Sequence, residues 1–298
     1  MDHIDREALH YNGRLSPGRS MKTNLIIQGA DIETADLKQL AKLSGASAIE
    51  QIDSCAFRLR GGRPADGIEA HAESRRLDFA FVPEERRLAD FRLLVMDMDS
   101  TLITIETVDE LADMVGLKDE VATITAQAMR GEIEYDESLR RRVGLLKGLE
   151  ERALQRVYDE RLKLTPGAEI LLERTQSLGI RTLLVSGGFT FVTDRLKTRL
   201  NLDQCHSNLL EITDGRLTGQ VIGAIVNADG KRDALLKMRD DMKITREQII
   251  GIGDGANDLK FLAESGVGVA FHAKPIVRKQ TTHAINFVGL DGVLHLFS

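Results

Sequence analysis

A short apolar run followed at once by two carboxylates constrains this chain more than any other feature of its sequence. Phe91 to Met96 is mostly apolar and predicts a buried parallel strand, and Asp97 and Asp99 come directly after it. If the strand continues through both residues, their side chains share a face, because side chains along a strand alternate. At the carboxyl end of the strand they would point into the crevice where open α/β sheets bind ligands. A nucleophilic carboxylate beside a second carboxylate and a divalent cation is a recurring arrangement for splitting phosphate esters through an aspartyl-phosphate.

Three further segments of the sequence suit the same phosphate chemistry. Ser186-Gly187-Gly188 follows the apolar run Thr182 to Val185, Gly253 to Asp258 follows the apolar run Ile249 to Ile252, and Lys231 lies between the two in the sequence. A Gly-rich turn that leads into a helix suits a phosphate group, because backbone N–H groups point at the anion. Each segment alone also has an ordinary structural explanation: turn hydrogen bonds for the aspartates, a helix cap for the serine and a solvated surface group for the lysine.

In this order the four segments resemble the four motifs of the haloacid dehalogenase-like phosphatases, and the resemblance extends over residues 91–298. It implies an α/β fold with a Rossmann-like parallel sheet and a reaction through an aspartyl-phosphate. Asp97 is then the nucleophile and Asp99 the general acid and base. Lys231 neutralises charge on the phosphate and the nucleophile, although the neighbouring Arg232 competes for this role.

The resemblance also implies one Mg²⁺ ion and a set of phosphate contacts. The expected metal ligands are the side chains of Asp97 and Asp254 and the backbone carbonyl of Asp99, because Mg²⁺ takes a few hard oxygen ligands and keeps several waters. Asp258 is expected to orient waters or Lys231 without binding the metal ion directly. The expected substrate-binding residues of these motifs are Ser186, Gly187, Gly188, Lys231 and Asn257.

The substrate must be chosen by the segment between the first motif and Pro166, which keeps helical spacing of apolar residues and predicts a small helical cap at about 106–165. Within the superfamily, Glu106, Met129 and Arg142 make the chain similar to the phosphoserine phosphatases. In that family the glutamate meets the substrate ammonium, the arginine meets its carboxylate, and the methionine lines the pocket. A zwitterionic amino acid does need one anion and one bidentate cation across a small pocket. Without the resemblance, Glu106 would be a helix-dipole charge and Arg142 part of a solvated helix face.

The resemblance therefore implies a hydrolase that converts O-phospho-L-serine to L-serine and phosphate, the last step of serine biosynthesis. Two alternatives stay open. Phosphoryl transfer to another hydroxyl acceptor, such as homoserine, would keep the covalent step. A sensor of amino acids, acting through residues 22–85, would be a regulatory protein instead.

The region before the first motif predicts a leader and a small domain. Residues 1–21 are polar and are expected to be flexible. Asn24 to Gln28 and Ala56 to Leu59 predict strands on either side of a helix at Asp36 to Leu43. This order suggests a small α+β domain at 22–85, similar in outline to the ACT-like regulatory domains of metabolic enzymes, and a homodimer formed through it. The charged stretch Pro83 to Asp90 is the expected linker to the phosphatase domain at 91–298.

Composition and motif context argue against several other classes of protein. The formal net charge is −6 and no long Lys/Arg cluster occurs, so we expect no nucleic-acid partner. No apolar run reaches the ~18 residues that would span a membrane. Cys55 and Cys205 predict no disulfide framework, and we expect a soluble cytoplasmic protein. Gly251-x-Gly253-x-x-Ala256 fits the dinucleotide fingerprint, but no acidic residue follows about 20 positions later, so no nicotinamide cofactor is expected.

Overall fold

The computed structural model describes residues 22–297, so the leader expected at 1–21 lies outside the described residues. The chain divides into two compact units that alternate along the sequence. One unit comprises the residues up to Arg92, Pro166–Ile180 and the residues from Arg246 onward. The other comprises Leu93–Thr165 and Arg181–Thr245. Among the described residues, no helix has the length and apolar character needed to cross a bilayer.

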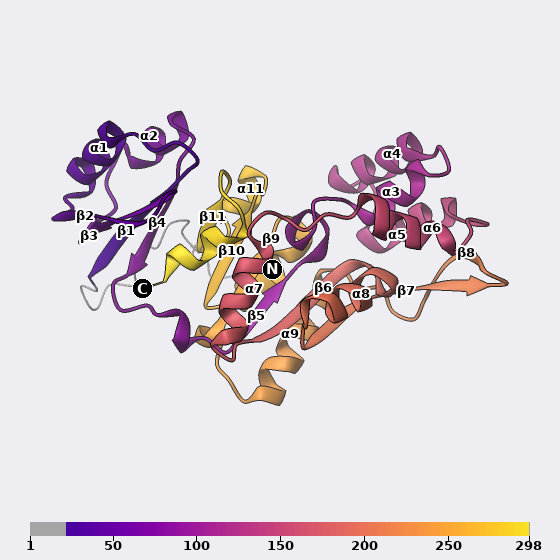
Figure 1. Ribbon diagram of the computed structural model, residues 1–298. Helices are drawn as coiled ribbons and strands as arrows, with labels where there is room; N and C mark the ends of the chain where they lie inside the picture. Colours follow the sequence, from indigo (N-terminus) through magenta and orange to yellow (C-terminus); the bar gives the residue numbers. More distant parts are fainter. Residues whose placement is uncertain (1–21, 298) are drawn as a thin grey trace, which may run out of the picture. The chain divides into compact units, whose positions relative to one another are not determined.

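The first unit begins with a four-stranded antiparallel sheet of order β2-β3-β1-β4. Its elements are β1 (Thr23–Gln28), α1 (Thr34–Ser44), β2 (Ala48–Asp53), β3 (Ala56–Arg60), α2 (Ile68–Ser74) and β4 (Asp78–Pro83). Helices α1 and α2 lie on one face of the sheet (Figure 1), and apolar side chains such as Leu25, Leu40 and Leu59 fill the space between helices and strands. The expected α+β domain is present, with three more elements than the two strands and one helix that the sequence predicts.

The rest of the first unit is a parallel α/β arrangement. Strands β9 (Ile249–Gly253), β10 (Val267–Phe271) and β11 (His283–Ile285) pair in this order and run parallel. They are accompanied by α7 (Ala168–Ser177), α10 (Leu259–Ala263) and α11 (Pro275–Arg278), and a 3₁₀ turn at Leu290–Leu296 follows. Buried aliphatic residues occupy every position of β9 and β10 other than glycine and Phe271, as expected for strands covered on both faces.

The second unit carries a second set of strands. Strands β5 (Leu93–Met96), β6 (Arg181–Phe189) and β7 (Gln204–Thr213) are parallel in this order, and β8 (Arg216–Ile222) returns antiparallel to β7. Helices α8 (Thr190–Leu200) and α9 (Ala228–Met242) complete the arrangement. The hairpin turn lies at Asp214-Gly215, and both residues have positive φ.

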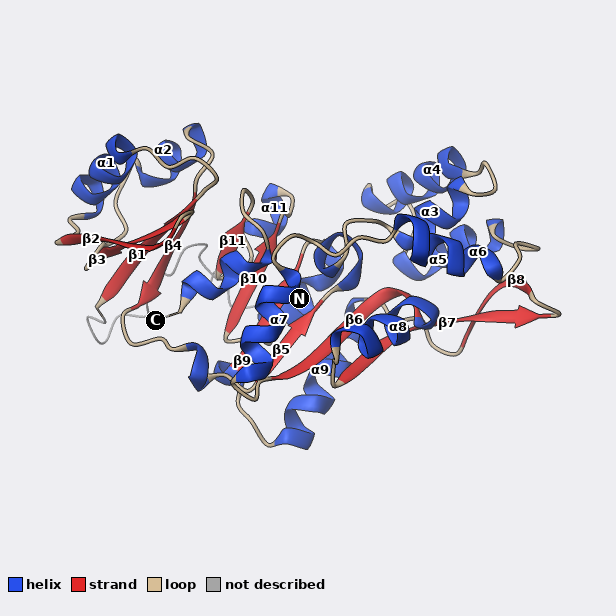
Figure 2. Cartoon of the chain, viewed as in Figure 1, coloured by secondary structure: helices blue, strands red, loops and turns tan. Residues whose placement is uncertain are grey.

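A group of helices between β5 and α7 forms the cap of the second unit. It consists of α3 (Thr107–Asp113), α4 (Lys118–Met129), α5 (Tyr135–Leu145) and α6 (Arg152–Arg156), which surround a core that includes Leu111, Val121 and Leu139. The β7–β8 hairpin extends from the strands to α5 and α6 (Figure 2). Gly148 N donates to Leu217 O at 2.8 Å, and Leu217 N donates to Leu149 O at 2.9 Å. The segment between α5 and α6 is therefore tied to β8 by its backbone.

Candidate active site

The first motif begins where β5 ends. The strand stops at Met96, and the chain turns sharply at Ser100, whose φ is +56°. The premise that the strand continues through both aspartates is therefore wrong, and a tight turn positions Asp99 instead. Asp97 is 5% exposed, and its Oδ1 accepts a hydrogen bond from Lys231 Nζ at 2.7 Å. A carboxylate held against a buried ammonium stays charged and is ready to act as a nucleophile.

Lys231 is presented by the first turns of α9. Asn227 caps this helix, since its Oδ1 accepts from Asp229 N at 3.0 Å and Gly230 N at 3.1 Å. The Lys231 side chain is 1% exposed, which is tolerable for an ammonium because Asp97 pairs with it. Arg232, the competing choice, forms exposed ion pairs with Asp229 and Asp233. The geometry therefore favours Lys231 as the cation of this site.

Asp99 is buried and has the environment of a proton carrier. Thr107 Oγ1 donates to its Oδ1 at 2.6 Å. Burial, and then the nearby carboxylate of Glu106, raise the pKa of Asp99 to about 8, so this acid holds a proton at neutral pH. Burial also raises the pKa of Glu106, whose Oε1 accepts from Ser100 Oγ at 2.7 Å. No sequence pattern marks Thr107 and Ser100 as site residues. The turn at Ser100 brings Thr107 to Asp99 and Ser100 to Glu106.

The second motif lies at the end of a strand. The sequence predicts that the strand ends at Val185 and that Ser186 to Gly188 form a turn, whereas β6 continues to Phe189 with a register irregularity after Val185. Gly188 N donates to Ser186 Oγ at 2.8 Å. The irregularity removes the motif from regular pairing with β7, so side chains and not the neighbouring strand supply partners to its backbone groups.

Asn208, which the sequence analysis missed, fixes the second motif from β7. Its side chain is 1% exposed. Its Nδ2 donates to Gly187 O at 2.8 Å, and its Oδ1 accepts from Val226 N at 2.8 Å. Asn208 therefore links the Gly187 peptide to the residues that lead into α9. No motif pattern marks this residue, since an asparagine in a strand is ordinary until its two partners are known.

Both glycines of the second motif are required by close neighbours. A Cβ at Gly187 would collide with the hydroxyl of Tyr135, the first residue of α5. A Cβ at Gly188 would lie 2.7 Å from Met98 Cε and 3.1 Å from Asp99 Oδ2. The second motif thus lies against the turn of the first motif and against the cap, and Tyr135 is a further site residue that the sequence analysis missed.

The three predicted cap residues lie in different environments. Arg142 in α5 has a buried Nε for which no partner exists among the described residues. Its positive charge lowers the pKa of Glu106, which places the two groups within electrostatic reach. Arg141, and not Arg142, pairs with Glu137, at 2.7 Å. Met129, at the end of α4, is 68% exposed.

The fourth motif follows β9 in the first unit. Asp258 Oδ2 accepts from Asp254 N at 3.1 Å and from Gly255 N at 3.0 Å, so Asp258 shapes the loop that carries Asp254 and the half-buried Asn257. A Cβ at Gly253 would collide with the Asp258 carboxylate, and one at Gly251 with Ser265 Oγ. These contacts account for the glycines of the apparent dinucleotide fingerprint without a nucleotide.

Three carboxylates of these motifs could hold a metal ion. They are Asp97 of the first motif and Asp254 and Asp258 of the fourth. An all-carboxylate set of hard oxygen donors fits a hard divalent cation. Asp258 is one of these carboxylates, and its Oδ2 also accepts the two backbone hydrogen bonds of the loop.

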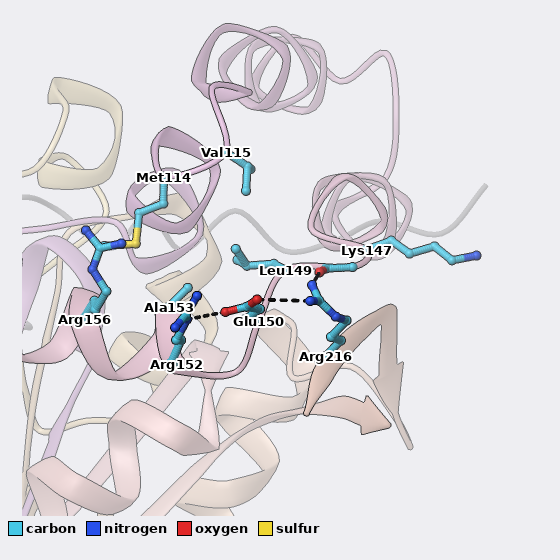
Figure 3. A pocket seen from close by; sticks show the side chains of 10 residues that line it. Met114, Val115, Lys147, Leu149, Glu150, Arg152, Ala153, Arg156 and Arg216 are labelled. Carbon is cyan, nitrogen blue, oxygen red and sulfur yellow. Dashed lines mark hydrogen bonds and ion pairs between the residues drawn. The ribbon is translucent and has the colours of Figure 1, made fainter. Parts of the chain in front are cut away.

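A cavity of about 430 Å³ opens elsewhere, next to α6 and the segment between α5 and α6 (Figure 3). Four basic side chains line it, but Glu150 pairs with both Arg152 and Arg216 at its centre. None of the predicted catalytic residues lines this cavity. The candidate active site is therefore defined by the motifs and not by this cavity.

Comparison with known proteins identifies the family. The model of haloacid dehalogenase-like hydrolases matches residues 94–263, and that of a domain of unknown function (DUF4072) matches residues 25–68. A phosphoserine phosphatase of Polaromonas sp. is 52% identical over 215 residues, which are 70% of this chain and 91% of that protein.

Solved structures agree. An unliganded probable phosphoserine phosphatase from Vibrio cholerae has a TM-score of 0.80 at 35% identity and covers 92% of this chain and 86% of that chain. A phospho-aspartyl intermediate analogue of phosphoserine phosphatase has a TM-score of 0.66 at 35% identity, covering 70% of this chain and 99% of that chain. The predicted α/β fold with a helical cap is thereby confirmed, and the chain belongs to the phosphoserine phosphatases of the haloacid dehalogenase-like hydrolase superfamily.

Proposed function

We propose that this protein hydrolyses O-phospho-L-serine to L-serine and phosphate through an aspartyl-phosphate on Asp97. One observation carries the proposal: the buried Asp97–Lys231 pair at 2.7 Å lies beside a second aspartate, Asp99, whose pKa burial raises. This combination supplies a charged nucleophile, a cation for the phosphoryl group and an acid in one place. The membership of the chain in the phosphoserine phosphatases supports the choice of substrate.

In the first step, Asp97 attacks the phosphorus and the bond between phosphorus and the serine oxygen breaks. Asp99 gives its proton to the departing oxygen, so L-serine leaves as a neutral alcohol. Lys231, the Ser186 hydroxyl and the Gly187 N–H group offset the charge that the three phosphoryl oxygens carry. The raised pKa of Asp99 favours its protonated form, which supplies the proton for this step.

In the second step, water attacks the phosphorus of the aspartyl-phosphate. Asp99, now ionised, takes a proton from this water, and the bond between Asp97 and phosphorus breaks. Phosphate leaves, and both aspartates return to their starting states. Mg²⁺ held by Asp97, Asp254 and the Asp99 carbonyl would neutralise phosphoryl charge when it is bound.

Recognition of the serine part is assigned to the cap. Glu106 faces the ammonium group and Arg142 the carboxylate of the substrate. The buried Nε of Arg142 has no partner among the described residues, and a substrate carboxylate would supply one. Both cysteines are free, which fits our placement of the reaction in the reducing cytoplasm.

Phosphate release from a panel of phosphomonoesters tests this function. The panel contains O-phospho-L-serine, O-phospho-L-threonine, a sugar phosphate and a nucleotide, each with Mg²⁺. We expect strong preference for O-phospho-L-serine and loss of activity in Asp97→Asn and after chelation, because the substitution removes the nucleophile and chelation removes the cation that neutralises phosphoryl charge. Asp233→Asn, an exposed aspartate of α9, serves as the matched control.

Two outcomes would contradict the proposal. Preference for the sugar phosphate or the nucleotide would retain the catalytic core but overturn the roles of Glu106 and Arg142. Formation of O-phosphohomoserine in the presence of L-homoserine, detected by ³¹P NMR at the expense of free phosphate, would make the protein a phosphotransferase.

A further inference from the structure

Tyr135 joins the cap to the phosphate-binding segment. It is the first residue of α5, and its ring packs against the apolar core of the cap. Its hydroxyl lies so close to Gly187 that a Cβ at Gly187 would collide with it. The phenol oxygen therefore lies on the surface of the second motif, where only a glycine leaves room for it.

The Tyr135 hydroxyl is a neutral donor in charged surroundings. Burial raises the pKa of Tyr135 to about 12; Lys231 and Arg142 act to lower this pKa, and Asp97 and Asp99 act to raise it. The phenol thus keeps its proton throughout the physiological range. No hydrogen bond involves this hydroxyl within residues 22–297, although the four ionisable groups Lys231, Arg142, Asp97 and Asp99 are all within electrostatic reach.

Neighbouring hydrogen bonds hold Tyr135 in this place. Asp136, the next residue, accepts from Asn227 Nδ2 at 2.9 Å. Asn227 is also the cap of α9, which carries Lys231. On the other side, Asn208 fixes the Gly187 peptide. The start of α5, the Gly187 peptide and the start of α9 are therefore connected around one point, at which the phosphoryl group is expected.

We propose that Tyr135 is a specificity-determining residue through which the cap recognises the phosphoryl group, its hydroxyl donating a hydrogen bond to a phosphoryl oxygen bound at Gly187. This inference rests on the proposed function, because it assigns a contact within the same site. A phosphorylated ligand then bridges the core and the cap and holds the cap closed. L-Serine lacks this acceptor, so its release follows the loss of the phosphoryl group.

The test removes a single oxygen atom, that of the Tyr135 hydroxyl. Tyr135→Phe in the full chain keeps the ring in the cap core and removes only the hydroxyl, and Tyr158→Phe, in the same cap, is the matched control. Steady-state kinetics with O-phospho-L-serine are measured together with inhibition by inorganic phosphate and by L-serine. Because a hydrogen bond to a charged group is lost, we expect Tyr135→Phe to weaken inhibition by phosphate and raise KM on the order of tenfold to a hundredfold. Inhibition by L-serine should stay within about twofold, and Tyr158→Phe should match the unsubstituted protein.

Two results would overturn the inference. If Tyr135→Phe keeps the KM, kcat and phosphate inhibition of the unsubstituted protein, the hydroxyl makes no contact with the ligand and only the ring matters. If inhibition by L-serine weakens as much as inhibition by phosphate, the hydroxyl binds the amino-acid part. Absence of phosphoserine hydrolysis in the unsubstituted protein would instead refute the proposed function. Calorimetric titration of both proteins with inorganic phosphate would then still decide whether Tyr135 binds it.

Discussion

At the scale of single residues, the proposed role of Asp99 as acid and then as base separates the two chemical steps. Its replacement by asparagine keeps the shape of the side chain but removes proton transfer. We expect Asp99→Asn to lower kcat for O-phospho-L-serine by about 10²- to 10⁴-fold, the usual contribution of general acid–base catalysis. An aryl ester such as p-nitrophenyl phosphate should still phosphorylate Asp97, since its leaving group departs without a proton. A burst of nitrophenol followed by slow turnover, recorded by stopped flow, is the expected signature.

The matched control for Asp99→Asn is Asp113→Asn, an exposed aspartate in α3 that pairs with Arg161. This substitution should leave both the burst and the steady turnover of p-nitrophenyl phosphate as they are in the unsubstituted protein. Steady turnover of the aryl ester by Asp99→Asn at the rate of the unsubstituted protein would show that another group activates the water, and Asp99 would lose its second role.

Residues whose function follows from their own chemistry could be predicted from the sequence, and residues that act through neighbours could not. Asp97 and Asp254 follow apolar strands, so strand geometry alone brings each to a strand end. Asn208 and Tyr135 are neutral, and each lies against Gly187, which is 21 residues from Asn208 in sequence and 52 from Tyr135. Such partners depend on which segments fold together, and no local pattern encodes that.

At the scale of elements, the β7–β8 hairpin supports the cap through a close backbone approach. Gly219 in β8 has a φ of +85°, and a Cβ there would lie 3.1 Å from Lys147 Cβ and 3.2 Å from Gly144 O. Gly215 in the hairpin turn has a φ of +71° but no atom within 4 Å of a built Cβ. The two positions therefore share the conformational requirement for glycine and differ in crowding.

Alanine substitutions at these two positions measure the contribution of this approach. Gly215→Ala should lower the free energy of unfolding by about 1 kcal/mol, the cost of a left-handed alanine. Gly219→Ala should lower it by about 2 to 4 kcal/mol, because overpacking against the end of α5 is added. Urea unfolding followed by circular dichroism checks both values. Equal losses of unfolding free energy in the two variants would mean that Gly219 is not closely packed against the end of α5.

The missed elements share a physical cause. Strand β2 buries none of its residues fully, so it shows no apolar alternation that could predict a strand. Helix α2 has seven residues and follows a Gly67 of positive φ, without the polar cap that would mark its start. Strand β6, by contrast, was predicted too short, because Ser186 and its glycines look like a turn in sequence.

At the scale of the whole molecule, the amino-terminal sheet is joined to the carboxyl-terminal residues of its unit by buried polar groups. Asp78 in β4 accepts from Asn286 N and from Phe287 N, both at 2.8 Å. His295 bridges Gln28 and Asp53 at 2.6 and 2.7 Å. A purely independent sensor domain would not need such an interface, so the contacts argue that this domain also stabilises the catalytic fold.

The interface contains a group that should make the fold sensitive to acid. His283 Nε2 accepts a hydrogen bond from Arg86 Nη1 at 2.9 Å. His283 Nδ1 is buried without a partner among the described residues. Burial, and then the charge of Arg86, lower the pKa of His283 to about 3. Protonation would place two cations side by side in a buried site, so the folded state holds this imidazole neutral.

The sign of the effect follows from linkage. The unfolded chain binds a proton at its ordinary pKa of 6.5 and the folded chain only near 3, so stability is fully present above pH 6.5 and is lost as the pH falls toward 3. Each pH unit in this window should cost up to about 1.4 kcal/mol of unfolding free energy. His283→Gln removes the titration and keeps an acceptor for Arg86, so its stability should fall less between pH 6.5 and 5. Urea unfolding across this window measures both slopes. The exposed His206→Gln should retain the slope of the unsubstituted protein, and an equal slope in His283→Gln would show that His283 is already charged in the folded state.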